Sequence, residues 1–132
     1  MVSVSSNTQS ATAGARKLLE ENPQINLLVG FNEWSTLGVG MAIKELGLKD
    51  RVCAIGFDNN TECVGMLETG ELDTLIVQNP FSMGYLAVMN AANILSGKKT
   101  ESVIKTDVYV VDRSNMFSAD VQKILFGFDK YD

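Results

Sequence analysis

The sequence contains no histidine and only two cysteines among its 132 residues. Without histidine, neither a Ser-His-Asp nor a Cys-His catalytic arrangement can form. Cys53 and Cys63 are not spaced as a CxxC pair, so the chain offers neither a zinc site nor a thioredoxin-type redox centre. We expect both cysteines to be plain thiols that are buried or half-buried.

Basic residues and long apolar runs are also scarce. Eleven Lys and Arg against sixteen Asp and Glu give a net charge of -5, and the longest basic run is Lys98-Lys99. We therefore expect no nucleic-acid binding by this segment. The longest fully apolar stretches, such as residues 27–29, are far shorter than the roughly 20 residues that cross a bilayer, so no membrane span is expected.

An apolar content of 45% over 132 residues is sufficient for one hydrophobic core, so residues 1–132 are expected to form a single domain. Three short, nearly continuous apolar runs predict parallel strands covered on both faces: residues 25–30, 52–57 and 72–77. Residues 2–5 are a candidate leading strand. Residues 103–111 are β-rich and half-polar, which predicts a strand at a sheet edge.

Helical periodicity fills the intervals between these runs. The predicted helices cover residues 8–21, 36–46, 60–69, 81–96 and 118–126. Ser35 is the candidate N-cap of the second helix, and Gly47 is its stop signal. The alternation of strand and helix predicts an α/β fold with three layers, in which a mostly parallel sheet has helices on both faces.

In an open parallel α/β sheet, ligands bind beyond the carboxyl ends of the strands. Asn32, Asp58 and Gln78 follow the three predicted strands in this way, and Phe31 and Trp34 flank Asn32. Two amides and a carboxylate match the donors and acceptors of adjacent hydroxyl groups, and an aromatic ring suits the C–H face of a sugar. These residues favour a carbohydrate or polyol site, although polar residues after strands also cap helices, and aromatics also fill cores.

The residues give little support to glycoside cleavage, calcium binding or dinucleotide binding. A glycosidase would need two facing carboxylates, for which only Glu33 and Asp58 are available. Residues 58–69 fail the EF-hand pattern, because Cys63 and Thr69 stand where Gly and Glu are required. Residues 38–40 (GVG) lack the third glycine of a dinucleotide loop, and close packing of a helix on the sheet explains them better. We therefore expect no catalysis, no metal and no cofactor.

A set of motifs in combination resembles a known family. The motifs are INLLVGFNE (25–33), LGVGMAI (37–43), IGFD (55–58), LETGELD (67–73), VQNP (77–80) and MGY (83–85). From about residue 8 to about residue 115, the chain resembles the C-terminal part of ribose-type periplasmic sugar-binding proteins. These belong to the type I periplasmic binding protein superfamily, which includes lactose-repressor-like effector domains.

The resemblance implies one incomplete lobe of a two-lobed receptor for an ABC importer, in which a sugar is trapped between lobes that close about a hinge. In that family, residues matching Asn32, Asp58 and Gln78 hydrogen-bond the sugar hydroxyls. The intact parent would be extracytoplasmic, periplasmic or a cell-surface lipoprotein, and would work with an ABC permease. The N-terminal lobe, and the opening strand and helix of the second lobe, are not in this chain.

The resemblance also implies that the helix over residues 81–96 belongs to the missing lobe. Its apolar stripe would then need another partner, so we expect a homodimer or a domain swap through this helix. Two alternative functions remain. One is the effector-sensing part of a lactose-repressor-type transcriptional regulator, which would be cytoplasmic, and the other is a flavodoxin-like enzyme or signalling domain.

Overall fold

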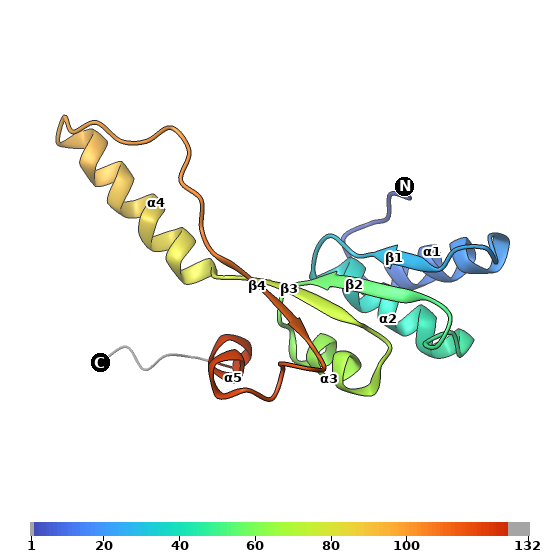
Figure 1. Cartoon of the computed structure of the whole chain (residues 1–132). Coiled ribbons are helices and arrows are strands. Elements are labelled where there is room, and N and C mark those ends of the chain that lie inside the picture. The colour runs from blue at the N-terminus through green and yellow to red at the C-terminus, as the bar shows by residue number, and fades with distance from the viewer. Residues whose placement is uncertain (1, 127–132) are drawn as a thin grey trace. The chain divides into compact units, whose positions relative to one another are not determined.

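The computed structural model describes residues 2–126, which form two compact units (Figure 1). The first unit consists of residues up to 77 together with those from 110 onward, and the second consists of residues 78–109. Five helices and four strands alternate along the described residues, beginning with a helix. The α/β class predicted from the sequence is confirmed.

The sheet has the strand order β1-β2-β3-β4. Its strands are β1 (Leu27–Val29), β2 (Cys53–Phe57), β3 (Thr74–Gln78) and β4 (Val108–Asp112). The first three run parallel, with Ile55 of β2 paired to both Val29 and Thr74, so their carboxyl ends lie at one edge. β4 ends the strand order, as its half-polar sequence predicts.

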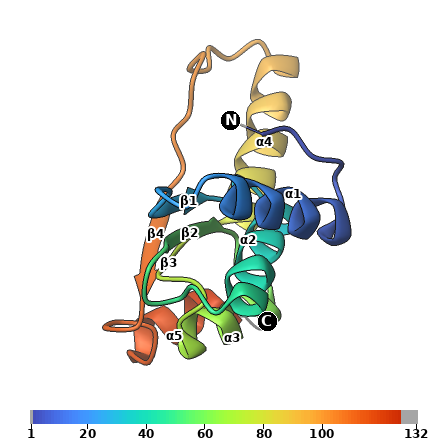
Figure 2. The same ribbon diagram turned by 90° about the vertical axis from the view of Figure 1, so that its right-hand side faces the viewer.

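Three helices of the first unit precede β1, β2 and β3 in turn. They are α1 (Thr8–Glu21), α2 (Glu33–Leu46) and α3 (Thr61–Thr69). α1 and α2 lie side by side (Figure 2), and α2 also packs on β2 and α3. Gly38 permits the first contact, because a Cβ there would lie 2.4 Å from the Cβ of Ala11. The close approach is thus between two helices, and not between helix and sheet as the sequence suggested.

The core of the first unit consists of aliphatic side chains from these helices and from the face of the sheet that they cover. Its fully buried members include Ala42, Ile43, Ala54, Leu67, Leu72 and Leu75. The first unit continues after β4 with α5 (Ala119–Phe126), whose buried residue is Leu125. Asn59 anchors this last helix by donating from Nδ2 to the carbonyl oxygens of Ile124 and Leu125, at 3.2 and 2.9 Å.

The second unit is built around α4 (Pro80–Leu95), followed by an extended segment over residues 98–107. α4 contains no charged residue and no buried residue. Its exposed apolar side chains recur every three or four positions, at Phe81, Tyr85, Val88, Ala92 and Leu95. The assignment of this helix to a second lobe stays a prediction.

Four further local expectations were wrong. Cys53 is exposed, and not buried or half-buried as expected. Residues 2–5 form no strand, and Val4 instead lies over Gly14 of α1. α2 begins at Glu33 and not after Ser35, because Asn32 is the N-cap. β1 is not covered on both faces, since it ends the strand order and leaves Leu27 49% exposed.

No helix within residues 2–126 is both long enough and apolar enough to cross a membrane.

Candidate functional site

Asn32 lies directly beyond the carboxyl end of β1, where it caps α2. Its Oδ1 accepts the backbone N–H of Ser35 at 2.9 Å, and the Ser35 hydroxyl accepts the backbone N–H of Asn32 at 3.0 Å, which forms a capping box. The alternative that a polar residue after a strand caps a helix therefore applies to Oδ1 of Asn32. Within residues 2–126 the Nδ2 group has no hydrogen-bond partner, so the exposed amide retains two donors for a ligand.

Asp58 follows β2 in a left-handed backbone conformation, with φ of 70°. Among the described non-glycine residues it alone has a positive φ, and such conformations concentrate at ligand-binding sites. Its backbone N–H bonds to the carbonyl oxygen of Ile76 in β3 at 3.0 Å, which fixes the turn. The half-buried carboxylate accepts no hydrogen bond from residues 2–126 and so keeps its acceptor capacity.

A buried threonine holds α2 against the end of β2. The hydroxyl of Thr36 accepts the backbone N–H of Phe57 at 2.9 Å and lies 3.3 Å from its carbonyl oxygen. Gly56 makes room for it, because a Cβ there would lie 2.2 Å from Cγ2 of Thr36. The polar start of α2 and the loop after β2 are therefore fixed close together.

Aromatic side chains border these polar groups. Phe31 is 71% exposed, and its ring lies 6.1 Å from that of Phe57 in a tilted pair. Trp34 is 43% exposed in the first turn of α2. Neither Phe31 nor Trp34 is a core residue, so the alternative that these aromatics fill the interior does not apply to them. Exposed rings beside amides and carboxylates are suited to the apolar face of a sugar ring.

Gln78, the third predicted polar residue, is the last residue of β3 and is half-buried. Because β1, β2 and β3 are parallel neighbours, Asn32, Asp58 and Gln78 each follow or end a strand at the same end of the sheet. Gln78 is the first residue of the second unit. Directly after it, Asn79 caps α4 by accepting the backbone N–H of Ser82 at 3.0 Å.

Sequence reasoning missed a polar pair at the same end of the sheet. Asn60 caps α3 through Oδ1 and donates from Nδ2 to Oε1 of Glu33 at 2.7 Å. Their positions in the sequence could have indicated the pair, because Glu33 lies in the first turn of one helix and Asn60 lies just before the next. From the sequence, Glu33 is a candidate partner of Asp58 in glycoside cleavage, and no pairing with Asn60 is predicted.

The electrostatic environment of this edge is acidic. Burial, and after it the carboxylates of Glu33, Glu62 and Asp58, raise the pKa of the Cys63 thiol to about 12. These carboxylates are therefore close enough to influence a thiol in the first turn of α3. No cluster of three His, Cys, Asp or Glu side chains within residues 2–126 is arranged to hold a metal ion.

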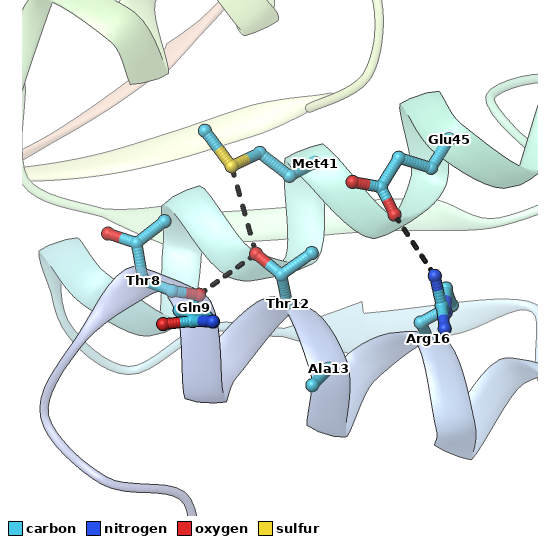
Figure 3. A pocket seen from close by; sticks show the side chains of 7 residues that line it. All are labelled: Thr8, Gln9, Thr12, Ala13, Arg16, Met41 and Glu45. Atoms are coloured by element: carbon cyan, nitrogen blue, oxygen red, sulfur yellow. Dashed lines mark hydrogen bonds and ion pairs between the residues drawn. The ribbon is translucent and has the colours of Figure 1, made fainter.

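A shallow groove of about 470 Å³ lies between α1 and α2 (Figure 3). Three of its polar side chains already have partners: Arg16 pairs with Glu45 at 3.8 Å, and the Thr12 hydroxyl donates to the carbonyl oxygen of Thr8 at 2.9 Å. Met41, which lines the groove, is nine residues and therefore about 13 Å along α2 from Asn32. The groove is part of helix packing and is separate from the strand ends.

A family model described as a periplasmic binding protein domain matches residues 2–99. The chain therefore belongs to the periplasmic binding protein family. It is 31% identical over 94 residues to the ribose import binding protein RbsB of Haemophilus influenzae, and 34% identical over 87 residues to RbsB of Bacillus subtilis. The alignments cover 71% and 66% of this chain but only 32% and 28% of those proteins, so the chain spans about a third of their length.

Solved structures agree with the sequence relatives. A carbohydrate transporter solute-binding protein from Agrobacterium radiobacter, in complex with D-arabinose, superposes with a TM-score of 0.82 and 30% identity. The match covers 90% of this chain and 40% of that protein. The family resemblance is thereby confirmed, and the family is one of solute-binding transport proteins and not of enzymes.

Proposed function

We propose that this chain is the C-terminal part of a two-lobed sugar-binding protein that delivers a monosaccharide or polyol to an ABC permease. The matched relatives are sugar-binding proteins, and the matched stretch covers only 32% and 28% of their length. Two exposed surfaces support the proposal that the rest of such a protein packs against this chain. β1 leaves Leu27 49% and Val29 36% exposed, and α4 buries none of its residues. Apolar surfaces of this kind usually mark contacts with another polypeptide.

Sugar hydroxyls are bound, in this proposal, by Asn32, Asp58 and Gln78, with Phe31 and Trp34 against the ring. The observation that carries the proposal is the carboxylate of Asp58. It is half-buried, held by an unusual backbone conformation, and accepts no hydrogen bond within residues 2–126. A half-buried carboxylate that accepts no hydrogen bond from the protein keeps acceptor positions that two hydroxyl groups of a sugar would fill.

Charge narrows the substrate class to neutral sugars. Asp58, Glu33 and Glu62 all act on the buried Cys63 thiol, so negative potential is concentrated at this edge. A phosphorylated or acidic sugar would add a like charge in a partly desolvated site and would be repelled. Neutral hydroxyl groups, in contrast, can both donate to the Asp58 carboxylate and accept from the Asn32 amide.

The test is titration calorimetry on the complete protein that carries this chain, with D-ribose, D-arabinose, D-allose and D-fucose as probes and ribose 5-phosphate as the charged comparison. We expect one neutral sugar to bind and the phosphate ester not to bind. Asp58→Ala should weaken binding by about 10-fold or more, because hydrogen bonds to a charged group are lost. Asp50→Ala, at an exposed turn, removes the same charge and should leave affinity unchanged. Unchanged affinity in Asp58→Ala would show that the site is wrongly assigned.

The same proposal predicts weak or undetectable sugar binding by residues 1–132 alone. About half of the contacts and the closing motion of the two lobes would be missing, and both contribute to affinity. It also places the complete protein outside the cytoplasm, in the periplasm or on the cell surface. Fractionation of cells that express the complete gene tests this location.

A further inference from the structure

In addition to the contact between Thr36 and Phe57, a hydrogen bond between two side chains joins the segments that carry Asn32 and Asp58. Glu33 directly follows Asn32, and Asn60 is two residues beyond Asp58. The Nδ2 of Asn60 donates to Oε1 of Glu33 at 2.7 Å, which is a short, charge-assisted contact between half-buried side chains. The bond therefore bridges the start of α2 and the start of α3 at the carboxyl end of the sheet.

The orientation of the Asn60 amide is fixed from both sides. Its Oδ1 accepts the backbone N–H of Glu62 at 2.8 Å, so Nδ2 is the free end of the amide and is directed toward Glu33. At this edge the β-ladder ends close to the site: the backbone N–H of Gly30 bonds to the carbonyl oxygen of Ile55 at 2.9 Å. Asn32 lies two residues beyond Gly30, so its distance from Asp58 depends on contacts made by side chains.

We propose that Glu33 and Asn60 are positioning residues for the sugar site, which fix the distance between the Asn32 amide and the Asp58 carboxylate. This inference rests on the proposed sugar binding. Two groups that recognise adjacent hydroxyls must keep a separation that matches the sugar, and a shift of a fraction of an ångström weakens both hydrogen bonds. The pair acts through Asn32 and Asp58 and does not itself contact the sugar.

The chain allows a test in which the hydrogen bond is broken and then rebuilt with reversed polarity. Asn60→Asp keeps a good N-cap but removes the donor and places a second carboxylate against Glu33. In the double variant Glu33→Gln/Asn60→Asp, the new amide at position 33 donates to the new carboxylate at position 60. Glu33→Ala removes the acceptor altogether, and Glu68→Ala is the control for loss of one exposed glutamate from α3.

The measurement is the dissociation constant of the complete protein for the best-binding sugar of the four probes, well below the lowest melting temperature of the variants. We expect Glu33→Ala and Asn60→Asp each to weaken binding by roughly 10-fold, and the double variant to recover most of that loss. Glu33→Gln alone should stay within about 3-fold of the parent, since its carbonyl oxygen still accepts from Asn60. Glu68→Ala should bind normally.

Recovery of sugar binding in the double variant distinguishes a positioning role from direct contact with the sugar and from no role at all. If the double variant binds no better than Asn60→Asp, or if Glu33→Ala binds as tightly as the parent, the pair does not position the site. If Glu33→Gln binds as weakly as Glu33→Ala while Asn60→Asp binds normally, Glu33 contacts the sugar directly and the inference is wrong. Failure of the unaltered protein to bind any neutral sugar overturns the proposed function itself, and this inference falls with it.

Discussion

Gly56 in β2 is the position where one added methyl group should have the clearest consequence. In Gly56→Ala, the new Cβ would lie 2.2 Å from Cγ2 of Thr36 and 3.1 Å from a methyl group of Leu75. Overpacking of this kind costs about 2 kcal/mol. Replacement of glycine by alanine within a strand also raises the free energy of unfolding by about 0.5 kcal/mol, because the unfolded chain becomes less flexible. We therefore expect a net destabilisation of about 1.5 kcal/mol.

A second substitution should relieve the clash. Thr36→Ser removes Cγ2 but keeps the hydroxyl that accepts the Phe57 N–H at 2.9 Å. Alone it should cost about 1 kcal/mol, because it deletes one buried methyl group. In the double variant the methyl group of the alanine occupies the space of the lost Cγ2. The total should then be about 1.5 kcal/mol, which is less than the sum of about 2.5 kcal/mol for independent sites.

The assay is urea denaturation of the chain, followed by the fluorescence of Trp34, which is its single tryptophan. The free energies of unfolding of the parent, the two single variants and the double variant form a mutant cycle. Equal slopes of free energy against urea would show that the comparison is valid. If the two effects add to within about 0.3 kcal/mol, the packing of Thr36 on Gly56 described above is refuted.

Four further outcomes follow from other parts of the structure. Arg113→Met should lower stability by about 1 to 2 kcal/mol in thermal unfolding, because Arg113 donates to the carbonyl oxygens of Leu67 and Leu72; retained stability would contradict this. In the folded chain near pH 8, a thiol reagent should modify Cys53, which is exposed, and spare Cys63, whose pKa is raised to about 12 by burial, whereas both should react in urea. Because the pKa of Cys63 in the folded chain lies above the ordinary thiol value of 9.0, its contribution to stability is complete below pH 9 and is lost as the pH rises toward 12. Cys63→Ala should remove that part of the pH dependence of stability. Finally, residues 1–132 alone should associate at high micromolar concentration, and Val88→Lys on α4 should reduce the mass measured by light scattering; a strictly monomeric parent would refute self-association.

Much of the fold could be predicted from local sequence. Apolar runs and helix stop signals place most helices and strands within a few residues of their observed bounds, because helix ends depend on nearby residues such as Gly47 and Gly70, both with positive φ. The start of α2 was placed too late because Ser35 and Asn32 are both good caps. Only the observed capping box selects Asn32.

Strand pairing lies beyond what local pattern can show. The run at residues 2–5 resembles a strand, but a strand forms only by pairing with a neighbour, and Val4 packs instead on Gly14 of α1. The apolar run that contains β1 predicts burial on both faces, yet β1 ends the strand order and leaves Leu27 and Val29 exposed. Burial depends on what lies next to an element in space.

The sequence by itself determined the order of strands and helices and the kinds of side chain that follow each strand. Their chemistry was sufficient to indicate a hydroxyl-rich ligand, because donors and acceptors are properties of residue types. The tertiary structure alone decided which atoms remain available. It uses the Asn32 oxygen as a helix cap, holds Asp58 in a left-handed turn, and joins Glu33 to Asn60 across two helix starts. The contact between Glu33 and Asn60 connects residues 27 positions apart, and no local pattern specifies a distance of that kind.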